Sequence, residues 1–365
     1  MNLRITKRGA GILGAVVGLT AAGVAAGVAA ERYLVRRSRS GDDPYQDEPF
    51  GALPATTSDT VTTAAGLDLH VETVDLDPAA AADGNADGNA DADAVTLVFV
   101  HGFCLDMGTF HFQRTAFAKR YRMVFYDQPG HGRSGRITTG EYALADLGAC
   151  LRTVIDRFAP TGRVVLVGHS MGGMAIMAFA EQCPELIGDR VAGVAFISSS
   201  AGDLDEVRFG MPQILARFRA PLLPVVRLAG PVAASVIDRA RNASTDLAWL
   251  LTRRYGFGTQ RPSAALVSYV ERMNSTTSLD VIARYLKTIY GHNRILALGA
   301  LRSVPVLVIC GDHDQVTPLE HSREIAEALP DARFEVIADG GHVALLEHAD
   351  EVNELLDDFI NEIAG

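Results

Sequence analysis

The sequence predicts an α/β fold in which a mainly parallel sheet is covered by helices on both faces. Short apolar runs rich in valine alternate with longer runs of helical periodicity from residue 95 to the C-terminus. Polar and glycine-rich motifs follow several of the short runs, as expected where functional groups gather at the carboxyl ends of parallel strands. With 365 residues, 48% of them hydrophobic and 21% charged, the chain can form one large α/β domain with insertions, or two domains.

The N-terminal region, residues 1–40, has the composition of a membrane-associated segment. Residues 9–30 carry no charge, and a helix of this length would cross a hydrocarbon core of about 30 Å. Basic residues flank the stretch on both sides, which favours an uncleaved anchor and leaves both orientations open. We therefore expect a membrane-anchored protein. The alternatives are a secreted protein whose signal is cleaved after Val28-Ala29-Ala30, and a soluble apolar tail.

Three segments lie between the N-terminal region and the main sheet. Residues 41–59 are polar and are expected to be a linker, and the alternating residues around Gly66, within 60–76, predict a β-hairpin. Residues 82–94 repeat Asp-Gly-Asn, but the glutamate and the flanking helices of a calcium-binding loop are missing. We expect a surface insertion there, and no metal or other cofactor.

The elements of the main sheet follow in chain order. The expected strands are 95–100, 123–126, 164–167, 191–197, 304–309 and 334–337, and the expected helices are 144–158, 171–180, 319–329 and 347–363. Between residues 203 and 298 the alternation stops, and helix-like patterns with several prolines take its place. We predict a core of residues 60–202 and 299–365 with a helical cap of residues 203–298; the alternative is that the insertion supplies further scaffold helices.

Charge and cysteine content exclude some classes of function. The formal net charge is −11, and residues 1–40 contribute +6, so the remaining chain carries −17. Such an acidic body argues against nucleic-acid binding, which needs a basic face. The four cysteines lie far apart in apolar stretches without the spacing of a metal site, so we expect buried free thiols.

The motif Gly168-His169-Ser170-Met171-Gly172 fits a nucleophile elbow, because a strand pattern precedes it and a helix pattern follows it. A serine at such a turn occupies a strained backbone conformation, and only small residues fit two positions to either side. We predict Ser170 as the nucleophile; the alternative is a glycine-rich turn with an incidental serine.

A serine needs a base to take its proton, and the base needs an orienting acid. His342 follows the last expected strand and Asp314 follows the one before it, which gives the order serine, acid, histidine expected after an elbow nucleophile. We predict His342 as the base and Asp314 as the acid. The rival acid is Asp312, two residues away.

The rival bases are His313, which precedes the helix expected from residue 319, and His348, which is expected within the last helix. Because of these positions, we expect neither of them to be the base. The cluster Asp312-His313-Asp314 could also be imagined with His342 as a metal site, but no second cluster completes it.

The developing oxyanion needs preorganised N–H donors. We expect the backbone N–H groups of Met171, at a helix N-terminus, and of Phe103, in the loop after the strand 95–100. The side chains of Phe103, Cys104 and Met171 are predicted to line the substrate pocket. Cys104 is not expected to act as a nucleophile, because no histidine is assigned to it.

Together these motifs resemble those of the α/β-hydrolase superfamily, in its serine lipase and esterase branch. The resemblance covers roughly residues 60–363 outside the expected cap and the Asp-Gly-Asn insertion, and it rests on the segments 101–104, 127–134, 168–173, 311–314 and 341–342. It implies an eight-stranded sheet with an antiparallel second strand and a helical cap after the sixth strand. A serine at the nucleophile position disfavours the epoxide-hydrolase and haloalkane-dehalogenase branches, which use aspartate.

The predicted function is hydrolysis of carboxylic esters with an apolar acyl or alcohol group, through an acyl-enzyme intermediate. A lipid-like substrate would fit a membrane anchor at residues 9–30. One alternative keeps the same three residues in an aminopeptidase of the proline-iminopeptidase type, where Asp203, Asp205 or Glu206 would hold the amine, or in a carbon–carbon bond hydrolase. An alternative of another class is a non-catalytic, membrane-attached binding protein.

Overall fold

The computed structural model describes residue 35 and residues 42–76, 95–137, 140–204 and 245–364. The apolar stretch 9–30, the Asp-Gly-Asn insertion 82–94 and residues 205–244 of the expected cap therefore lie outside the described residues. Among the helices that are described, none combines the length and the apolar character needed to cross a bilayer. The anchor at residues 9–30 thus stays a prediction.

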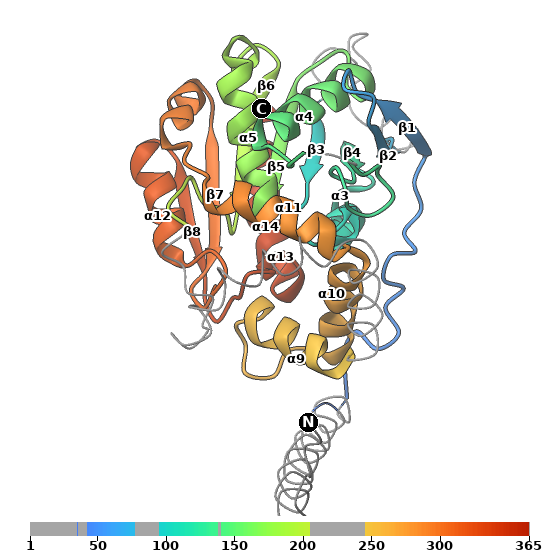
Figure 1. Cartoon of the computed structure of the whole chain (residues 1–365). Helices are drawn as coiled ribbons and strands as arrows, with labels where there is room; N and C mark the ends of the chain where they lie inside the picture. The colour runs from blue at the N-terminus through green and yellow to red at the C-terminus, as the bar shows by residue number, and fades with distance from the viewer. Residues whose placement is uncertain (1–34, 36–41, 77–94, 138–139, 205–244, 365) are drawn as a thin grey trace, which may run out of the picture.

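Eight strands form one sheet in the order β1-β2-β4-β3-β5-β6-β7-β8 (Figure 1). Strand β2 runs antiparallel to both of its neighbours, β1 and β4, and all other pairs are parallel. The predicted α/β fold with a mainly parallel eight-stranded sheet is confirmed. The strands are β1 (Thr57–Thr62), β2 (Asp68–Val74), β3 (Thr96–Val100), β4 (Arg122–Tyr126), β5 (Val164–His169), β6 (Val191–Ile197), β7 (Val306–Gly311) and β8 (Arg333–Ile337).

Helices cover both faces of this sheet because alternate strand residues point to opposite sides. In β3, Val98 and Val100 join the cluster that contains residues of α4, α5 and α11, whereas Leu97 and Phe99 join the cluster that contains residues of α3, α10 and α14. The helices are α3 (His111–Phe117), α4 (Leu144–Phe158), α5 (Met171–Gln182), α9 (Thr245–Gly256), α10 (Ala264–Thr276), α11 (Leu279–Tyr290), α12 (Leu319–Ala328), α13 (Ala344–Glu347) and α14 (Ala349–Ala364), with 3₁₀ turns η1 (Met107–Phe110), η2 (Pro184–Leu186) and η3 (Ile295–Ser303).

The described part of the segment between β6 and β7 contains helices joined by turns and loops, and no strand. Strands β6 and β7 pair in parallel, so the sheet continues across the insertion. Residues 245–303 contain α9, α10, α11 and η3, and Figure 1 shows α9 and α10 side by side at the end of the molecule where α13 also lies. The Trp249 indole N–H joins the two helices by donating to Ser268 Oγ at 2.9 Å. These helices agree with the expected helical content; their role as a cap stays a proposal.

Two differences from the predicted elements bear on the site. The last helix was expected to run unbroken over 347–363, but α13 ends at Glu347, and His348 lies between α13 and α14. The placement of His348 inside the last helix was therefore wrong. The expected linker 41–59 also contains the start of β1 and packs on the body, where the Phe50 ring stacks on Tyr269 with 4.4 Å between centroids. The spacing of apolar residues predicts neither the end of a helix at His348 nor the packing of the Phe50 ring on Tyr269.

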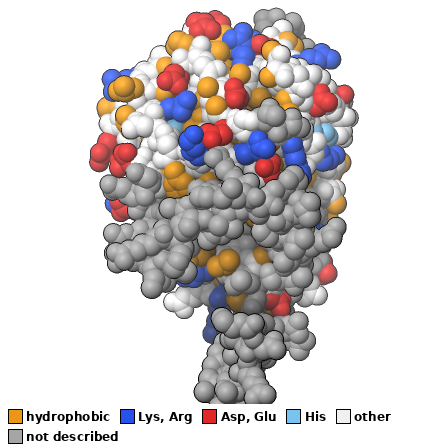
Figure 2. Space-filling view, in the orientation of Figure 1, with side chains coloured by type: hydrophobic (Ala, Val, Ile, Leu, Met, Phe, Trp, Pro, Cys, Tyr) orange, Lys and Arg blue, Asp and Glu red, His pale blue; other side chains and the backbone are white. Residues whose placement is uncertain are grey.

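Acidic and basic side chains are interspersed over the described part of the face shown in Figure 2. The four cysteines are free thiols; Cys150 and Cys310 are buried, and Cys104 and Cys183 are partly buried. In the part of the chain that the structure describes, no three His, Cys, Asp or Glu side chains gather as a possible metal site.

Candidate active site

Ser170 occupies the sharp turn between β5 and α5, with φ 53° and ψ −119°. A positive φ is uncommon for a residue with a side chain and marks local strain. The glycines on either side allow the close approach that the turn needs. A Cβ at Gly172 would clash with the Val100 carbonyl, and a Cβ at Gly168 would lie 2.7 Å from the Gly173 nitrogen.

The structure brings Ser170, His342 and Asp314 together from loops that follow β5, β8 and β7. His342 Nε2 lies 3.0 Å from Ser170 Oγ, and His342 Nδ1 lies 2.9 Å from Asp314 Oδ2. With a carboxylate facing Nδ1, we assign the ring proton to Nδ1, which leaves Nε2 free to accept from the serine hydroxyl. Only 6% of Ser170 and 8% of His342 is exposed to solvent, so the pair is shielded from water.

The Asp314 carboxylate is buried and holds several donors besides His342. Its Oδ1 accepts the backbone N–H groups of Val316 and Thr317 at 2.8 and 2.9 Å, and the Thr317 hydroxyl lies 3.0 Å from Oδ2. Burial by itself raises the pKa of Asp314, but the attraction of His342, the hydrogen bond to its ring and the two amides together lower that pKa below 3.8. Asp314 is therefore an ionised, fixed partner for His342.

The rival residues are exposed or bonded to other groups. Asp312 is exposed, and with His313 and the buried Asp314 it lines a cavity of about 470 Å³ beside Arg253 and Arg254. His313 is also exposed, with Nδ1 3.3 Å from the Gly258 carbonyl oxygen. His348 Nε2 lies 3.4 Å from the Asp339 carbonyl oxygen. The hydrogen bonds of Ser170 thus connect it to His342 and Asp314 and not to these groups.

Two backbone amides have the placement expected of oxyanion donors. Met171 is the first residue of α5, so its N–H has no partner within the helix, and Phe103 lies in the turn after β3. The structure records no acceptor for either amide among the residues it describes. Both donors are free to bind a substrate oxygen.

Neutral histidines hold the loop that carries Phe103. The Cys104 N–H donates to His131 Nε2 at 3.0 Å, and the Gln128 N–H donates to His101 Nε2 at 2.8 Å. Burial lowers the pKa of His101 to about 4; burial and the nearby His101 lower the pKa of His131 to about 3. Both rings are therefore neutral acceptors at neutral pH.

A carboxylate also holds the loop after β3 farther from Phe103, at Met107. Asp127 Oδ1 accepts the Met107 N–H at 3.0 Å, and Asp127 Oδ2 accepts the Arg133 N–H at 2.8 Å. The segment 127–134, which the sequence offered only as part of a family resemblance, thus fixes the loop that carries Phe103. In the sequence, the only signal for this role was the presence of Asp127 and His131 in the loop that follows the neighbouring strand.

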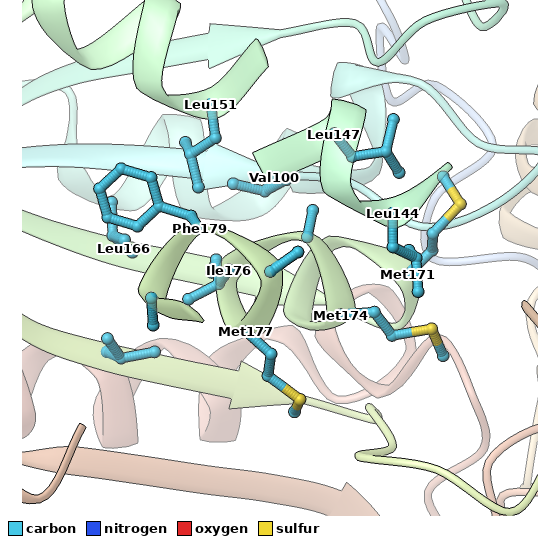
Figure 3. Packing of buried hydrophobic residues seen from close by; sticks show 14 of the residues in the cluster. Val100, Leu144, Leu147, Leu151, Leu166, Met171, Met174, Ile176, Met177 and Phe179 are labelled. Carbon is cyan, nitrogen blue, oxygen red and sulfur yellow. The ribbon is translucent and has the colours of Figure 1, made fainter. Parts of the chain in front are cut away.

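The predicted pocket residues differ in exposure. Phe103 and Cys104 are partly buried, and the Phe103 ring lies 5.7 Å from the ring of Tyr285 in α11. The Met171 side chain is fully buried in the cluster that includes Leu144 and Leu147 (Figure 3). Because the Met171 side chain is fully buried, the structure does not support the prediction that this side chain contacts substrate.

Comparison with known proteins identifies a family whose model matches this chain. Residues 95–349 match the family described as alpha/beta hydrolase fold. The chain is 29% identical over 282 residues to a 2-hydroxy-6-oxononadienedioate/2-hydroxy-6-oxononatrienedioate hydrolase of Paraburkholderia phymatum, covering 73% of this chain and 87% of that protein.

A second relative is longer. The chain is 29% identical over 277 residues to the dihydrolipoyllysine-residue acetyltransferase component of the acetoin cleaving system of Cupriavidus necator, covering 72% of this chain but 63% of that protein, less than two thirds of its length. Among solved structures, an esterase from Thermogutta terrifontis aligns with a TM-score of 0.63 at 23% identity, covering 85% of this chain and 100% of that chain. At this identity the structural likeness shows the fold.

Proposed function

The chain belongs to the alpha/beta hydrolase fold family and is a hydrolytic enzyme, and from this we propose that it cleaves carboxylic esters through an acyl-enzyme intermediate. The observation that carries the proposal is the hydrogen-bonded chain from Ser170 Oγ through His342 to the buried Asp314. Such a chain makes a serine hydroxyl nucleophilic at neutral pH.

In the proposed reaction Ser170 Oγ attacks the ester carbonyl carbon while His342 Nε2 takes the hydroxyl proton. The carbonyl oxygen becomes an oxyanion, held by the Phe103 and Met171 amides. Asp314 stabilises the imidazolium through its bond to Nδ1. As the C–O bond of the ester breaks, His342 returns the proton to the leaving alcohol. Water then attacks the acyl-serine by the same steps, releases the acid and restores Ser170.

Apolar contacts near the site support an apolar acyl or alcohol group. The partly buried Phe103 meets Tyr285, and Tyr285 stacks on Tyr142 with 4.3 Å between centroids. Tyr285 belongs to α11, within the segment 203–298 that we propose as the cap. Because Tyr285 is fully buried, the insertion would act here through Phe103, whose partly buried ring Tyr285 packs against.

We further propose that residues 9–30 anchor the enzyme in a membrane and that its substrate is lipid-like. The support is the uncharged stretch with its basic flanks. The test is fractionation of the full chain expressed in cells, followed by its intact mass. An anchored protein stays in the carbonate-washed membrane fraction at full mass, whereas a chain shortened after Ala30 and found outside the membrane shows a cleaved signal.

Carbon–carbon bond hydrolysis is the second candidate, favoured by the similarity to the Paraburkholderia phymatum hydrolase. It would use the same three residues. The aminopeptidase alternative has less support: Asp203 is exposed and lines a cavity whose lining does not include Ser170, and Asp205 and Glu206 lie outside the described residues.

The experiment that tests the proposal is labelling with a fluorophosphonate followed by a substrate panel. We expect wild type to label and Ser170→Ala not to label; an unlabelled wild type would contradict Ser170 as the nucleophile. Esters of graded chain length, lactones, amino-acid amides and a vinylogous diketone then separate the candidate bonds. With His342 as the base, kcat/KM falls in acid as His342 takes up a proton, and a profile flat from about pH 5 to 8 contradicts that role.

A further inference from the structure

The loop that carries His342 lies directly against the segment that follows α9. The Val343 N–H donates to the Gly256 carbonyl oxygen at 3.0 Å. A Cβ at Gly341 would lie 2.6 Å from that same oxygen and 2.5 Å from the Phe257 carbonyl carbon. The two backbones therefore touch without a side chain between them, so a shift of one displaces the other.

One carboxylate ties these two segments together. Glu347 Oε2 accepts the N–H groups of Gly341 at 2.8 Å and Gly258 at 2.9 Å. Glu347 Oε1 accepts the Thr259 N–H at 2.9 Å and the Thr259 hydroxyl at 2.8 Å. Hydrogen bonds to an ionised acceptor are stronger than neutral ones, and here four converge on one group.

We infer that Glu347 is a positioning residue that sets His342 against Ser170 and couples this alignment to the segment after α9; the inference rests on the proposed hydrolase function. The residue it holds, Gly341, directly precedes His342. The other side of the same loop is held by His169, whose Nε2–H donates to the His342 carbonyl oxygen at 2.8 Å. The backbone around His342 is thus held on two sides. His169, beside Ser170, binds the His342 carbonyl oxygen, and Glu347 binds the Gly341 N–H.

The chemistry of the four donors explains why a carboxylate is needed. All four are N–H or O–H groups, and only an ionised carboxyl offers acceptors on both of its oxygens. A glutamine would keep one oxygen and turn an NH₂ group toward N–H donors at the other position. The bonds to Gly341 and to Thr259 could then not both persist, although the shape of the side chain is unchanged.

Loss of the hydrogen bonds to Glu347 should change kcat more than KM. A misplacement of about 1 Å between reacting groups can cost on the order of 100-fold in rate. We expect Glu347→Gln to lower kcat by about ten- to 100-fold while KM changes by less than about threefold. The rate constant for fluorophosphonate labelling of Ser170 should fall by a similar factor.

Two variants and a spectroscopic readout separate positioning from stability. Thr259→Val removes only the hydroxyl donor, so its kcat should lie between wild type and Glu347→Gln. Glu354→Gln, at an exposed position of α14, is the matched control and should behave as wild type. The proton NMR signal of His342 Nδ1–H should shift or broaden in Glu347→Gln and not in the control, at a temperature where calorimetry shows every variant folded.

The outcomes distinguish this inference from the proposed function. Wild type that labels at Ser170, together with a reduced kcat and a changed Nδ1–H signal in Glu347→Gln, supports both. A Glu347→Gln enzyme with a lower melting temperature but with wild-type kcat, labelling rate and Nδ1–H signal overturns the positioning role alone. A wild type that does not label at Ser170 overturns the proposed function, and this inference with it.

Discussion

The two sides of Ser170 are built from different chemical groups. On the acid–base side, His342 meets the ionised Asp314, and its loop is held by the carboxylate of Glu347. On the oxyanion side, the loop with Phe103 is held by two uncharged rings: His131 accepts the Cys104 N–H, and His101, within the loop, accepts the Gln128 N–H. Both sides use buried acceptors for backbone N–H groups, but only one of them uses charge close to the reacting atoms.

The difference follows from the charges that the proposed reaction develops. His342 becomes a cation, which a nearby carboxylate stabilises. On the other side a negative oxygen forms, and an ionised acceptor beside its donors would repel it in a site of low dielectric constant. A neutral imidazole positions an amide without adding negative charge. Asp127 does accept an amide of the same loop, but at Met107, farther along.

The largest expected effect removes the charge on the acid–base side. Asp314→Asn should lower kcat by about 10⁴-fold, because an amide cannot hold His342 in the useful tautomer. Steady-state kinetics on one ester substrate measures it. Asp312→Asn is the matched control, since Asp312 is exposed and only two residues away. If Asp312→Asn were the damaging variant, the rival acid would be the correct one.

A matched pair at His131 tests the need for neutrality on the oxyanion side. Glutamine and glutamate can both accept the Cys104 N–H, and they differ in charge. We expect His131→Gln to lose about tenfold in kcat/KM and His131→Glu to lose about 100-fold, with the gap widening as pH rises and the carboxyl ionises. Affinity for a boronic acid transition-state analogue should fall in parallel. Equal activity of the two variants at every pH would contradict the need for a neutral acceptor on the oxyanion side.

The neutral histidines also predict how stability depends on pH. Burial lowers the pKa of His101 to about 4, and burial together with a neighbouring histidine lowers the pKa of His131 and of His169 to about 3. The unfolded chain, with histidine pKa values near 6.5, then binds more protons than the folded one in this range. Stability is therefore fully present above about pH 6.5 and is lost as pH falls toward the folded values, by up to about 1.4 kcal/mol per pH unit for each ring.

Urea unfolding at a series of pH values between about 5 and 7 measures this slope. His131→Gln should reduce the slope by about one proton. An identical slope in His131→Gln and wild type would show that folding does not lower the pKa of His131.

The smallest effect is expected at Cys104, which has a φ of 60° in the oxyanion loop. Glycine adopts this conformation without a steric cost, so Cys104→Gly should keep kcat within about twofold and change the free energy of unfolding by less than about 1 kcal/mol. Kinetics and thermal unfolding measure both quantities. A loss of labelling in Cys104→Gly would instead give the thiol a chemical role.

The sequence led to the correct architecture where burial is complete. The helix Leu144–Phe158 and the strand Val191–Ile197 have the predicted bounds, because an amphipathic helix leaves a periodic apolar pattern and a fully buried strand leaves a short continuous apolar run. The last helix differs more: its apolar pattern continues past His348, but α13 ends before His348 and α14 begins after it. A local cap of this kind does not alter the periodicity.

By itself, the sequence determined that Ser170, Asp314 and His342 would lie at one edge of the sheet, because the carboxyl ends of parallel strands share that edge. It could not choose between Asp314 and Asp312 by geometry; the loop after β7 buries one and exposes the other. The contacts of Glu347 with Gly258 and of His131 with Cys104 were also settled only by the tertiary structure. Their partners are backbone N–H groups of residues distant in the chain, and every residue except proline carries such a group, so no pattern of side chains identifies them.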